Sequence, residues 1–306
     1  MLLGANWLVD GSVAVAKRSG LSEFVIGATI VGIGTSMPEF VVSLFAAIKG
    51  NADITIGNVA GSNMFNSLFI LGITVLISPI VFTKQNLKKD IPLCLVVSCL
   101  LAFFVLDKAL WGSPANNISR IEALILFAGF IAYMVYSLKH GQKEPQTAAA
   151  EPQKAQVSLA KAIFMIVFGL AGLIFGGDLF VDSCSAIAKK MGVSDSIVAI
   201  TLMAGGTSLP ELATCIIAAR KNSHQLALGN ILGSNISNIL LIIGLSGSIV
   251  PLSVNSQSFF SLLIIPVSIL LLSISAYSFK KKCLDRYEGV IFIILYVAFI
   301  ITVVNI

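Results

Sequence analysis

The chain has 306 residues, of which 57% are hydrophobic and only 11% are charged, with a mean hydropathy of +0.95. A soluble domain carries roughly a quarter charged residues, so this composition excludes a soluble protein and indicates an integral membrane protein of many helices. The basic residues behind the net charge of +5 lie in loops between the apolar runs and not in one patch, so we expect the lipid bilayer, and no nucleic acid, as a partner.

Apolar runs of about 20 residues, the length that crosses a bilayer, recur along the whole chain. We expect spans near 24–48, 54–80, 91–107, 120–138, 160–188, 196–220, 226–250, 258–279 and 288–306, and a shorter run opens the chain at 1–16. With the N-terminus placed outside, about three quarters of the Lys and Arg residues fall in inner loops, as the positive-inside rule requires. The sequence therefore predicts an all-α membrane protein with about ten transmembrane helices and both termini outside.

The two halves of the chain are copies of each other. A shift of 172 residues aligns GANWLVDGSVAVAKRSGLSE at 4–23 with GGDLFVDSCSAIAKKMGVSD at 176–195. About a third of the positions from 4 to 80 are then identical. Each copy holds five spans, and an odd number of spans inverts the second copy in the membrane. Inverted repeats build many secondary transporters, whose binding sites lie at the repeat interface near the bilayer midplane, on interrupted helices.

The repeat divides the chain into three parts. We expect a first five-helix repeat over 1–136 with its motif region at 27–80, a linker over 137–158, and a second five-helix repeat over 159–306 with its motif region at 199–252. The linker is polar and has no hydrophobic period, which predicts a flexible cytoplasmic segment. The first span is shorter than its counterpart by about 15 residues. A chain that begins late and a misplaced translation start both fit this difference.

GTSMPEF at 34–40 and GTSLPEL at 206–212 place a proline and a glutamate in the middle of an apolar span of each repeat. A carboxylate at the bilayer centre costs about 2.5–3.5 kcal/mol on insertion scales, and no span carries a central basic residue that could pair with Glu39 or Glu211. Pro38 and Pro210 lack an N–H and free carbonyls one turn earlier, which need another partner in lipid. A bound cation meets both demands. A salt-bridged glutamate and a simple packing kink are the alternatives.

Helical spacing collects further oxygens on the face of each glutamate. The residues three, four and seven positions before Glu39 are Ser36, Thr35 and Gly32. The equivalent residues before Glu211 are Ser208, Thr207 and Ala204. In the following spans, GNVAGSNMFN at 57–66 and GNILGSNISN at 229–238 each carry one polar face, formed by Ser62, Asn63 and Asn66 and by Ser234, Asn235 and Asn238. The Gly57-x-x-x-Gly61 and Gly229-x-x-x-Gly233 pairs predict a close approach of helices. Any one of these residues could bond a neighbouring helix instead, but the paired set indicates a site.

The resulting site offers carboxylates, hydroxyls, amides and carbonyls, with no His or Cys. Hard oxygen ligands select Ca²⁺, Mg²⁺ or alkali cations over zinc or copper. Two glutamates balance one Ca²⁺, which fits a dehydrated site better than Mg²⁺ does, and the same oxygens can hold several Na⁺ instead. The five cysteines lack paired spacing and are interpreted as small apolar residues. No catalytic residue is expected, because the chain has no G-x-S-x-G elbow, no H-E-x-x-H and no His within a span.

The paired stretches GTSMPE…GNVAGSNMFN and GTSLPE…GNILGSNISN resemble the two α-repeats of the sodium/calcium exchangers, within the cation/Ca²⁺ exchanger superfamily. The resemblance covers nearly the whole chain. It implies ten spans, alternating access and exchange of about three Na⁺ for one Ca²⁺ with net charge movement. It also implies an antiporter in the inner membrane of a prokaryotic cell that needs no cofactor, with Ca²⁺ and Na⁺ as transported partners. A monomer is compatible with it, and the oligomeric state stays open.

The resemblance implies a role for each motif residue. Glu39 and Glu211 resemble the Ca²⁺-binding carboxylates, helped by the carbonyls of Thr35 and Thr207. The resemblance implies Na⁺ ligands at Ser36, Ser62, Ser208 and Ser234, at the carbonyls of Gly32 and Ala204, at both glutamates, and at Asn66 and Asn238, which line the centre. Some family members, including potassium-dependent ones, carry Asp at the position of Asn238. Asn removes a third carboxylate and argues against K⁺ co-transport.

Other functions stay open at this point. A Ca²⁺/H⁺ exchanger would let H⁺ compete at the same carboxylates, a potassium-dependent exchanger would add K⁺, and a cation channel would need no counter-ion. The hydroxyl-rich flanks of the glutamates favour Na⁺, and the inverted repeat favours alternating access over a channel. Outside the motifs, Asp10 and Asp182 are repeat partners that we expect to cap a helix or to pair with a nearby basic residue.

Overall fold

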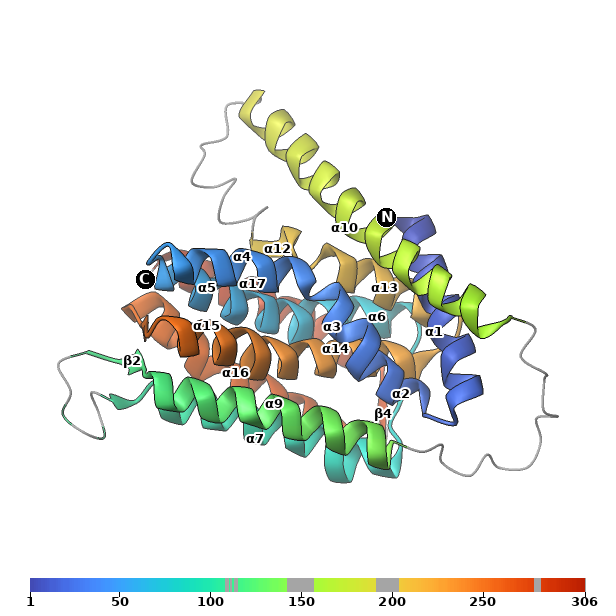
Figure 1. Cartoon of the computed structure of the whole chain (residues 1–306), viewed down its shortest axis with the longest axis horizontal. Coiled ribbons are helices and arrows are strands. Elements are labelled where there is room, and N and C mark those ends of the chain that lie inside the picture. The colour runs from blue at the N-terminus through green and yellow to red at the C-terminus, as the bar shows by residue number, and fades with distance from the viewer. Residues whose placement is uncertain are drawn as a thin grey trace.

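The computed structural model describes residues 1–107, 110, 112, 115–141, 157–190, 204–277 and 282–305. These residues form a bundle of long helices with two short sheets (Figure 1). The label η marks π-helical segments. The elements before the linker are α1 (Leu2–Ser19), α2 (Glu23–Ile26), η1 (Gly27–Val31), α3 (Gly32–Thr35), α4 (Met37–Ile48), α5 (Ala52–Met64), η2 (Phe65–Ile70), α6 (Leu71–Ile77), β1 (Ile80–Val81), η3 (Asn86–Asp90), α7 (Ile91–Phe104), β2 (Asn117–Ile118) and α9 (Arg120–His140). Those after it are α10 (Leu159–Lys190), α12 (Ala204–Gly206), α13 (Leu209–Arg220), α14 (His224–Ser237), η5 (Asn238–Ile243), α15 (Gly244–Ile249), β3 (Leu252–Ser253), α16 (Ser256–Ser275), β4 (Cys283–Leu284) and α17 (Arg286–Asn305).

The predicted spans coincide with helices to within a few residues. The span expected at 196–220 is seen from α12 onward, and its first residues lie outside the described part of the chain. By length and hydropathy, six of the described helices qualify as membrane spans, or seven if one broken pair counts as a span. The all-α membrane fold is confirmed, whereas the count of ten spans stays a prediction. The shorter first span also appears, because α1 has 18 residues and α10 has 32.

The linker assignment at 137–158 is only partly visible. Residues 137–140 form the last turn of α9, and α10 begins at Leu159. Residues 142–156 lie outside the described residues, so the flexibility of the linker stays a prediction, as do the repeat boundaries.

Both motif spans are interrupted at the serine that precedes the proline. Ser36 has φ −81° and ψ 8°, and Ser208 has φ −89° and ψ 8°, so the backbone leaves the helical path at each of them. Pro38 and Pro210 then stand in the first turn of α4 and α13, where a missing N–H costs no helical hydrogen bond. In the first repeat the two helical parts are bent by 49°. The predicted interruption of these spans is confirmed.

The motif-bearing helices form the centre of the bundle. The span made of α14, η5 and α15 is 94% buried and that of α5, η2 and α6 is 72% buried, whereas α9, α10 and α17 are each only 22% buried. These outer helices expose large apolar side chains such as Ile121, Phe175 and Val297. An apolar surface of this extent on a long helix is the one that a lipid bilayer covers.

Glycines let the two repeats cross at close range. Gly229 and Gly233 on α14 face the backbone of Phe24 and Ala28, and a Cβ at either glycine would meet a carbonyl oxygen at 2.2 or 2.3 Å. The predicted close approach through this glycine pair is confirmed. The equivalent contact of the glycines on α5 would fall at 196–200, outside the described residues, and stays a prediction.

Two antiparallel sheets join the repeats at opposite ends of the bundle (Figure 1). β1 pairs with β4, with Ile80 opposite Leu284, and β2 pairs with β3, with Ile118 opposite Leu252. β1 and β3 occupy equivalent positions in the two repeats, so the sheets follow the inverted repeat. We refer below to the β1–β4 end and the β2–β3 end of the bundle.

α1 and α10 pack along each other beside this centre. A Cβ at Gly169 of α10 would meet the backbone N of Leu8 at 2.7 Å, so the two helices touch through backbone. α1 also packs against α13, and Asp10 Oδ1 lies 2.7 Å from Lys221 Nζ. The expected pairing of Asp10 with a basic residue is therefore confirmed.

Candidate functional site

The two motif glutamates are held by serines of the opposite repeat. Glu39 and Glu211 lie in the first turn of α4 and α13 and are fully buried. Ser208 Oγ donates to Glu39 Oε1 at 2.7 Å, and Ser36 Oγ donates to Glu211 Oε1 at 2.9 Å. Because each carboxylate depends on the other repeat, neither half of the chain can build this arrangement alone.

A second serine approaches each carboxylate from the following span. Ser62 Oγ lies 3.4 Å from Glu39 Oε1, and Ser234 Oγ lies 3.5 Å from Glu211 Oε1. Ser234 Oγ also donates to the carbonyl of Gly32 at 3.1 Å. The structure therefore brings each glutamate within reach of two hydroxyls, with the Gly32 carbonyl in the same cluster.

The threonines at the breaks are held by asparagines that the sequence analysis did not single out. Thr35 Oγ1 donates to Asn230 Oδ1 at 3.1 Å, and Thr207 Oγ1 donates to Asn58 Oδ1 at 3.4 Å. The signal that could have found these asparagines is their recurrence in the repeated Gly-Asn pair that opens each polar stretch. For Ala204, the structure places the backbone at the first residue of α12.

Asn66 and Asn238 lie on the π-helical segments η2 and η5 that interrupt the central spans. A π-turn shifts the register of the side chains around it, and such turns are frequent at functional sites. Asn238 Nδ2 donates to Asn63 Oδ1 at 3.0 Å. Both polar atoms of Asn66 and the Oδ1 of Asn238 have no hydrogen-bond partner among the described residues, although each of the two residues is only 1% exposed.

The cluster as a whole has more buried oxygen than the described protein groups satisfy. Glu39 Oε2 and Glu211 Oε2 also lack a hydrogen-bond partner within the described residues. Buried carboxylates and amides without partners are costly unless a cation or a hydrogen-bond donor joins them. Among the described residues no three His, Cys, Asp or Glu side chains gather as a metal site. The arrangement therefore suits hard cations bound mainly by hydroxyl, amide, carbonyl and carboxylate oxygens.

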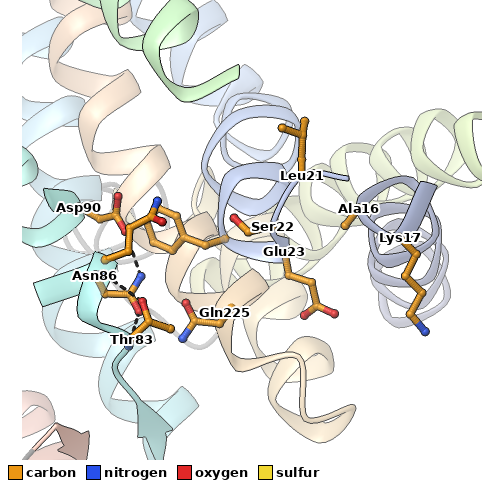
Figure 2. Close-up of a pocket in the computed structure, with 11 residues that line it drawn as sticks. Ala16, Lys17, Leu21, Ser22, Glu23, Thr83, Asn86, Asp90 and Gln225 are labelled. Atoms are coloured by element: carbon orange, nitrogen blue, oxygen red, sulfur yellow. Dashed lines mark hydrogen bonds between the residues drawn. The ribbon is translucent and has the colours of Figure 1, made fainter. Parts of the chain in front are cut away.

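A separate cavity of about 240 Å³ opens at the β1–β4 end, between the turn from α1 to α2 and the segment that runs from Thr83 through η3 (Figure 2). On one side Thr83, Asn86 and Asp90 are linked by hydrogen bonds, including Asn86 Nδ2 to Asp90 Oδ2 at 3.0 Å. Glu23 stands on the α2 side. None of the predicted site residues lines this cavity, so the candidate site is the enclosed centre and not this opening.

Comparisons with known proteins show which family the chain resembles. Residues 1–139 and 161–305 match the family described as sodium/calcium exchanger protein. The chain is 33% identical to the sodium/calcium exchanger MaX1 of Methanosarcina acetivorans, over 98% of this chain and 94% of that protein. It is 31% identical to the inner membrane protein YrbG of Escherichia coli, over 82% of this chain and 77% of that protein.

The fold is also similar to a solved structure, the sodium-calcium exchanger NCX_Mj soaked with zero Na⁺ and Ca²⁺. The TM-score is 0.83 at 32% identity, and the match covers 97% of this chain and 93% of that one. The family consists of transporters, which confirms that the chain is not an enzyme. It is a multi-pass membrane protein that belongs to the sodium/calcium exchanger family.

Proposed function

We propose that the chain is a secondary active antiporter that exchanges Na⁺ for Ca²⁺ by alternating access. The observation that carries this proposal is the reciprocal pairing of Ser36 with Glu211 and of Ser208 with Glu39 across the repeat interface. A site shared by two inverted repeats changes its exposure when one part of the bundle moves against the other. A carboxylate pair enclosed at that interface can serve ions from either side in turn.

Ca²⁺ is proposed to bind Glu39 and Glu211 together with the carbonyls of Thr35 and Thr207. Two carboxylates balance the charge of one Ca²⁺, and carboxylate and carbonyl oxygens are the ligands that this ion prefers. The carbonyls are available because the helix is interrupted at Ser36 and Ser208, directly after the two threonines, and the proline two residues further on keeps the helix from closing over the break. The Oε2 atoms of both glutamates, for which no described residue supplies a hydrogen bond, support this assignment.

Na⁺ is proposed to bind the same carboxylates with a different set of neighbours. That set comprises the hydroxyls of Ser36, Ser62, Ser208 and Ser234, the carbonyls of Gly32 and Ala204, and the amides of Asn66 and Asn238. Because both ions need Glu39 and Glu211, occupancy by one excludes the other, which is the condition for coupled exchange. With about three Na⁺ per Ca²⁺ one net charge crosses per cycle, worth about 2.3 kcal/mol per 100 mV of membrane potential.

The placement in the membrane is also part of the proposal. We propose that both termini lie outside and that the β1–β4 end faces the cytoplasm of a prokaryotic cell. The asymmetric distribution of Lys and Arg between loops supports this orientation. The prokaryotic relatives support the cell type.

The test is ⁴⁵Ca²⁺ uptake into proteoliposomes loaded with Na⁺, compared with K⁺-loaded vesicles and with a pH jump. We expect uptake to require internal Na⁺ and to rise at an inside-positive potential, because each cycle then moves one positive charge outward. Uptake driven by the pH gradient alone would indicate a Ca²⁺/H⁺ exchanger. A requirement for K⁺ would indicate a potassium-dependent exchanger, and uptake without any counter-ion gradient would indicate a channel.

A further inference from the structure

Two asparagines outside the proposed ligand set occupy equivalent positions in the repeats. Asn58 lies on α5 and is half-buried, and Asn230 lies on α14 and is fully buried. Among the hydrogen bonds of the described residues, neither side chain contacts a carboxylate of the site. Their role is therefore separate from that of the ligands.

Asn230 connects the break of the first repeat to the second repeat. Its Oδ1 accepts from Thr35 Oγ1 at 3.1 Å, and its Nδ2 lies 3.3 Å from the Sγ of Cys215 on α13. Cys215 is fully buried, so the amide is held at both ends. The interpretation of this cysteine as a small apolar residue is incomplete, because its sulfur accepts this hydrogen bond.

Asn58 makes the mirror connection. Its Oδ1 accepts from Thr207 Oγ1 at 3.4 Å, and its Nδ2 donates to Ser43 Oγ at 2.9 Å and to the backbone carbonyl of Glu39 at 3.2 Å. Ser43 is the repeat equivalent of Cys215. Sulfur is a weaker acceptor than a hydroxyl oxygen, so the amide of Asn58 is anchored more firmly than that of Asn230.

We infer that Asn58 and Asn230 are positioning residues that set the direction of the Thr207 and Thr35 carbonyls. This inference rests on the proposed function. The interruption at Ser36 and Ser208 leaves the carbonyl of the preceding threonine without a helical donor to orient it, and the hydroxyl of the same threonine donates to an amide of the opposite repeat. The direction of each threonine carbonyl then depends on how the two repeats pack against each other. The Ca²⁺ ligands therefore take their binding geometry only when the repeats are packed in this way.

The test compares Thr35→Val, which removes the hydroxyl and keeps the carbonyl, with Asn230→Ala and with the double variant. We expect the KM for Ca²⁺ in uptake to rise about tenfold in each single variant, the effect of one buried hydrogen bond, and no further in the double variant. Turnover at saturating Ca²⁺ should change less. Thr35→Ser restores the hydroxyl and should restore the KM.

Multiplying effects in the double variant, or a wild-type KM in Thr35→Val, would overturn the inference. If Asn230→Ala does not fold, Cys215→Ser provides the second measurement, because a stronger acceptor for the amide should lower the KM and an unchanged KM contradicts the role. The KM of Ca²⁺ uptake can be measured whichever counter-ion drives it. A failure of Na⁺ dependence in the wild type would therefore refute the proposed function without affecting this result.

A second, independent observation concerns charges away from the site. The ion pair between Asp10 and Lys221 has an equivalent in the repeat, namely Asp182 and Lys49. In the described part of the chain no ion pair joins this second set. Each repeat therefore carries one acidic and one basic residue at these positions, but within the described residues only Asp10 and Lys221 form an ion pair.

Helix packing also differs between the two repeats. α1 packs against α13, whereas the equivalent helices α10 and α4 are not among the closely packed pairs of the described residues. In Figure 1 the C-terminal end of α10 stands away from the bundle. At the centre, Asn238 bonds Asn63, but Asn66 Nδ2 and Asn235 Oδ1, which would form the equivalent bond, have no described partner.

We propose that the two ion pairs are alternating latches. In the state described here Asp10–Lys221 holds α1 against α13 at the β1–β4 end. In the opposite state the repeats exchange conformations, as inverted repeats do, and Asp182–Lys49 holds α10 against α4 at the β2–β3 end. Exposed ion pairs are weak, so each latch biases the equilibrium without trapping either state.

The test traps the opposite state directly. In a background whose native cysteines are replaced by serine, Asp182→Cys and Lys49→Cys are joined with a short bis-maleimide. We expect Lys221→Gln to speed this cross-linking about twofold to fivefold, the bias that an exposed ion pair supplies. Lys84→Gln, an exposed lysine near the same end, should not change it.

An unchanged rate in Lys221→Gln, or no cross-link in a protein that still transports Ca²⁺, would overturn the latch. Cross-linking does not depend on which counter-ion is exchanged, so its result is separate from that of the proposed function. The charge-exchanged variant Asp10→Lys with Lys221→Asp re-forms the pair and should return the cross-linking rate to its original value. A rate that stays raised contradicts the proposal.

Discussion

Glu39→Gln and Glu211→Gln are each expected to abolish Ca²⁺ transport while the fold stays intact. Glutamine keeps an acceptor for Ser208 or Ser36 and nearly the same volume, so the substitution removes charge and little else. A charge at contact distance from a cation is worth about 4 kcal/mol even at an intermediate dielectric, so uptake should fall at least about a hundredfold. The measurement is Na⁺-dependent ⁴⁵Ca²⁺ uptake in proteoliposomes. Asp53→Asn, at an exposed position on α5, is the matched control and should transport normally.

Thermal unfolding separates loss of the site from loss of the fold. Without ions, each glutamine variant should melt at the same or a higher temperature than the wild type, because a buried unpaired carboxylate is costly. Added Ca²⁺ should raise the melting temperature of the wild type and of Asp53→Asn, since a ligand that binds the folded state stabilises it. It should not do so for the glutamine variants. Normal exchange by either variant would refute the assignment of Ca²⁺ to these carboxylates.

The architecture was predictable because the sequence contains two copies of the same pattern. Pro38 and Glu39 recur as Pro210 and Glu211 at a constant shift, so chance and simple packing were poor explanations. Apolar run length then located the helices, since the thickness of a bilayer constrains it directly. The break before each proline followed from the missing N–H.

The partners of the site residues were not predictable in the same way. Spacing placed Ser36 on the face of Glu39, but in the structure Ser36 donates to Glu211, and Ser208 donates to Glu39. Helical periodicity defines a face and does not define which face meets it. The pairing depends on how two inverted copies cross, which is a tertiary property set by contacts such as those of Gly233.

The π-helical segments and the asparagine connections were missed for related reasons. A π-turn at Asn66 or Asn238 adds one residue to a helical turn and leaves no distinct residue pattern. Asn230 contacts Thr35 across 195 positions, and a buried amide is as common between packed helices as beside a binding site. The repeat marked both asparagines, but only the structure shows which hydroxyl each one holds.

Pro38→Ala is expected to lower exchange at least about tenfold without lowering stability. Alanine restores an N–H for the carbonyl of Gly34 and is favoured over proline inside a helix by about 3 kcal/mol, so α3 and α4 can join through Ser36. The 49° bend between them would then decrease, and Glu39 would move away from Ser208. The melting temperature should be equal or higher, because the variant adds a helical hydrogen bond to the folded state and removes no packing contact of the core.

Pro266→Ala is the matched control, because Pro266 stands inside α16 and outside the candidate site. It should gain helix stability in the same way and exchange at the wild-type rate. Equal losses of exchange in both variants would mean that the effect comes from general changes in the bundle and not from the break. Wild-type exchange in Pro38→Ala would mean that the carbonyls released at the break do not bind the transported ion. A loss of exchange in Pro38→Ala alone, at an unchanged or higher melting temperature, would show that transport depends on the interruption of this helix and that stability does not.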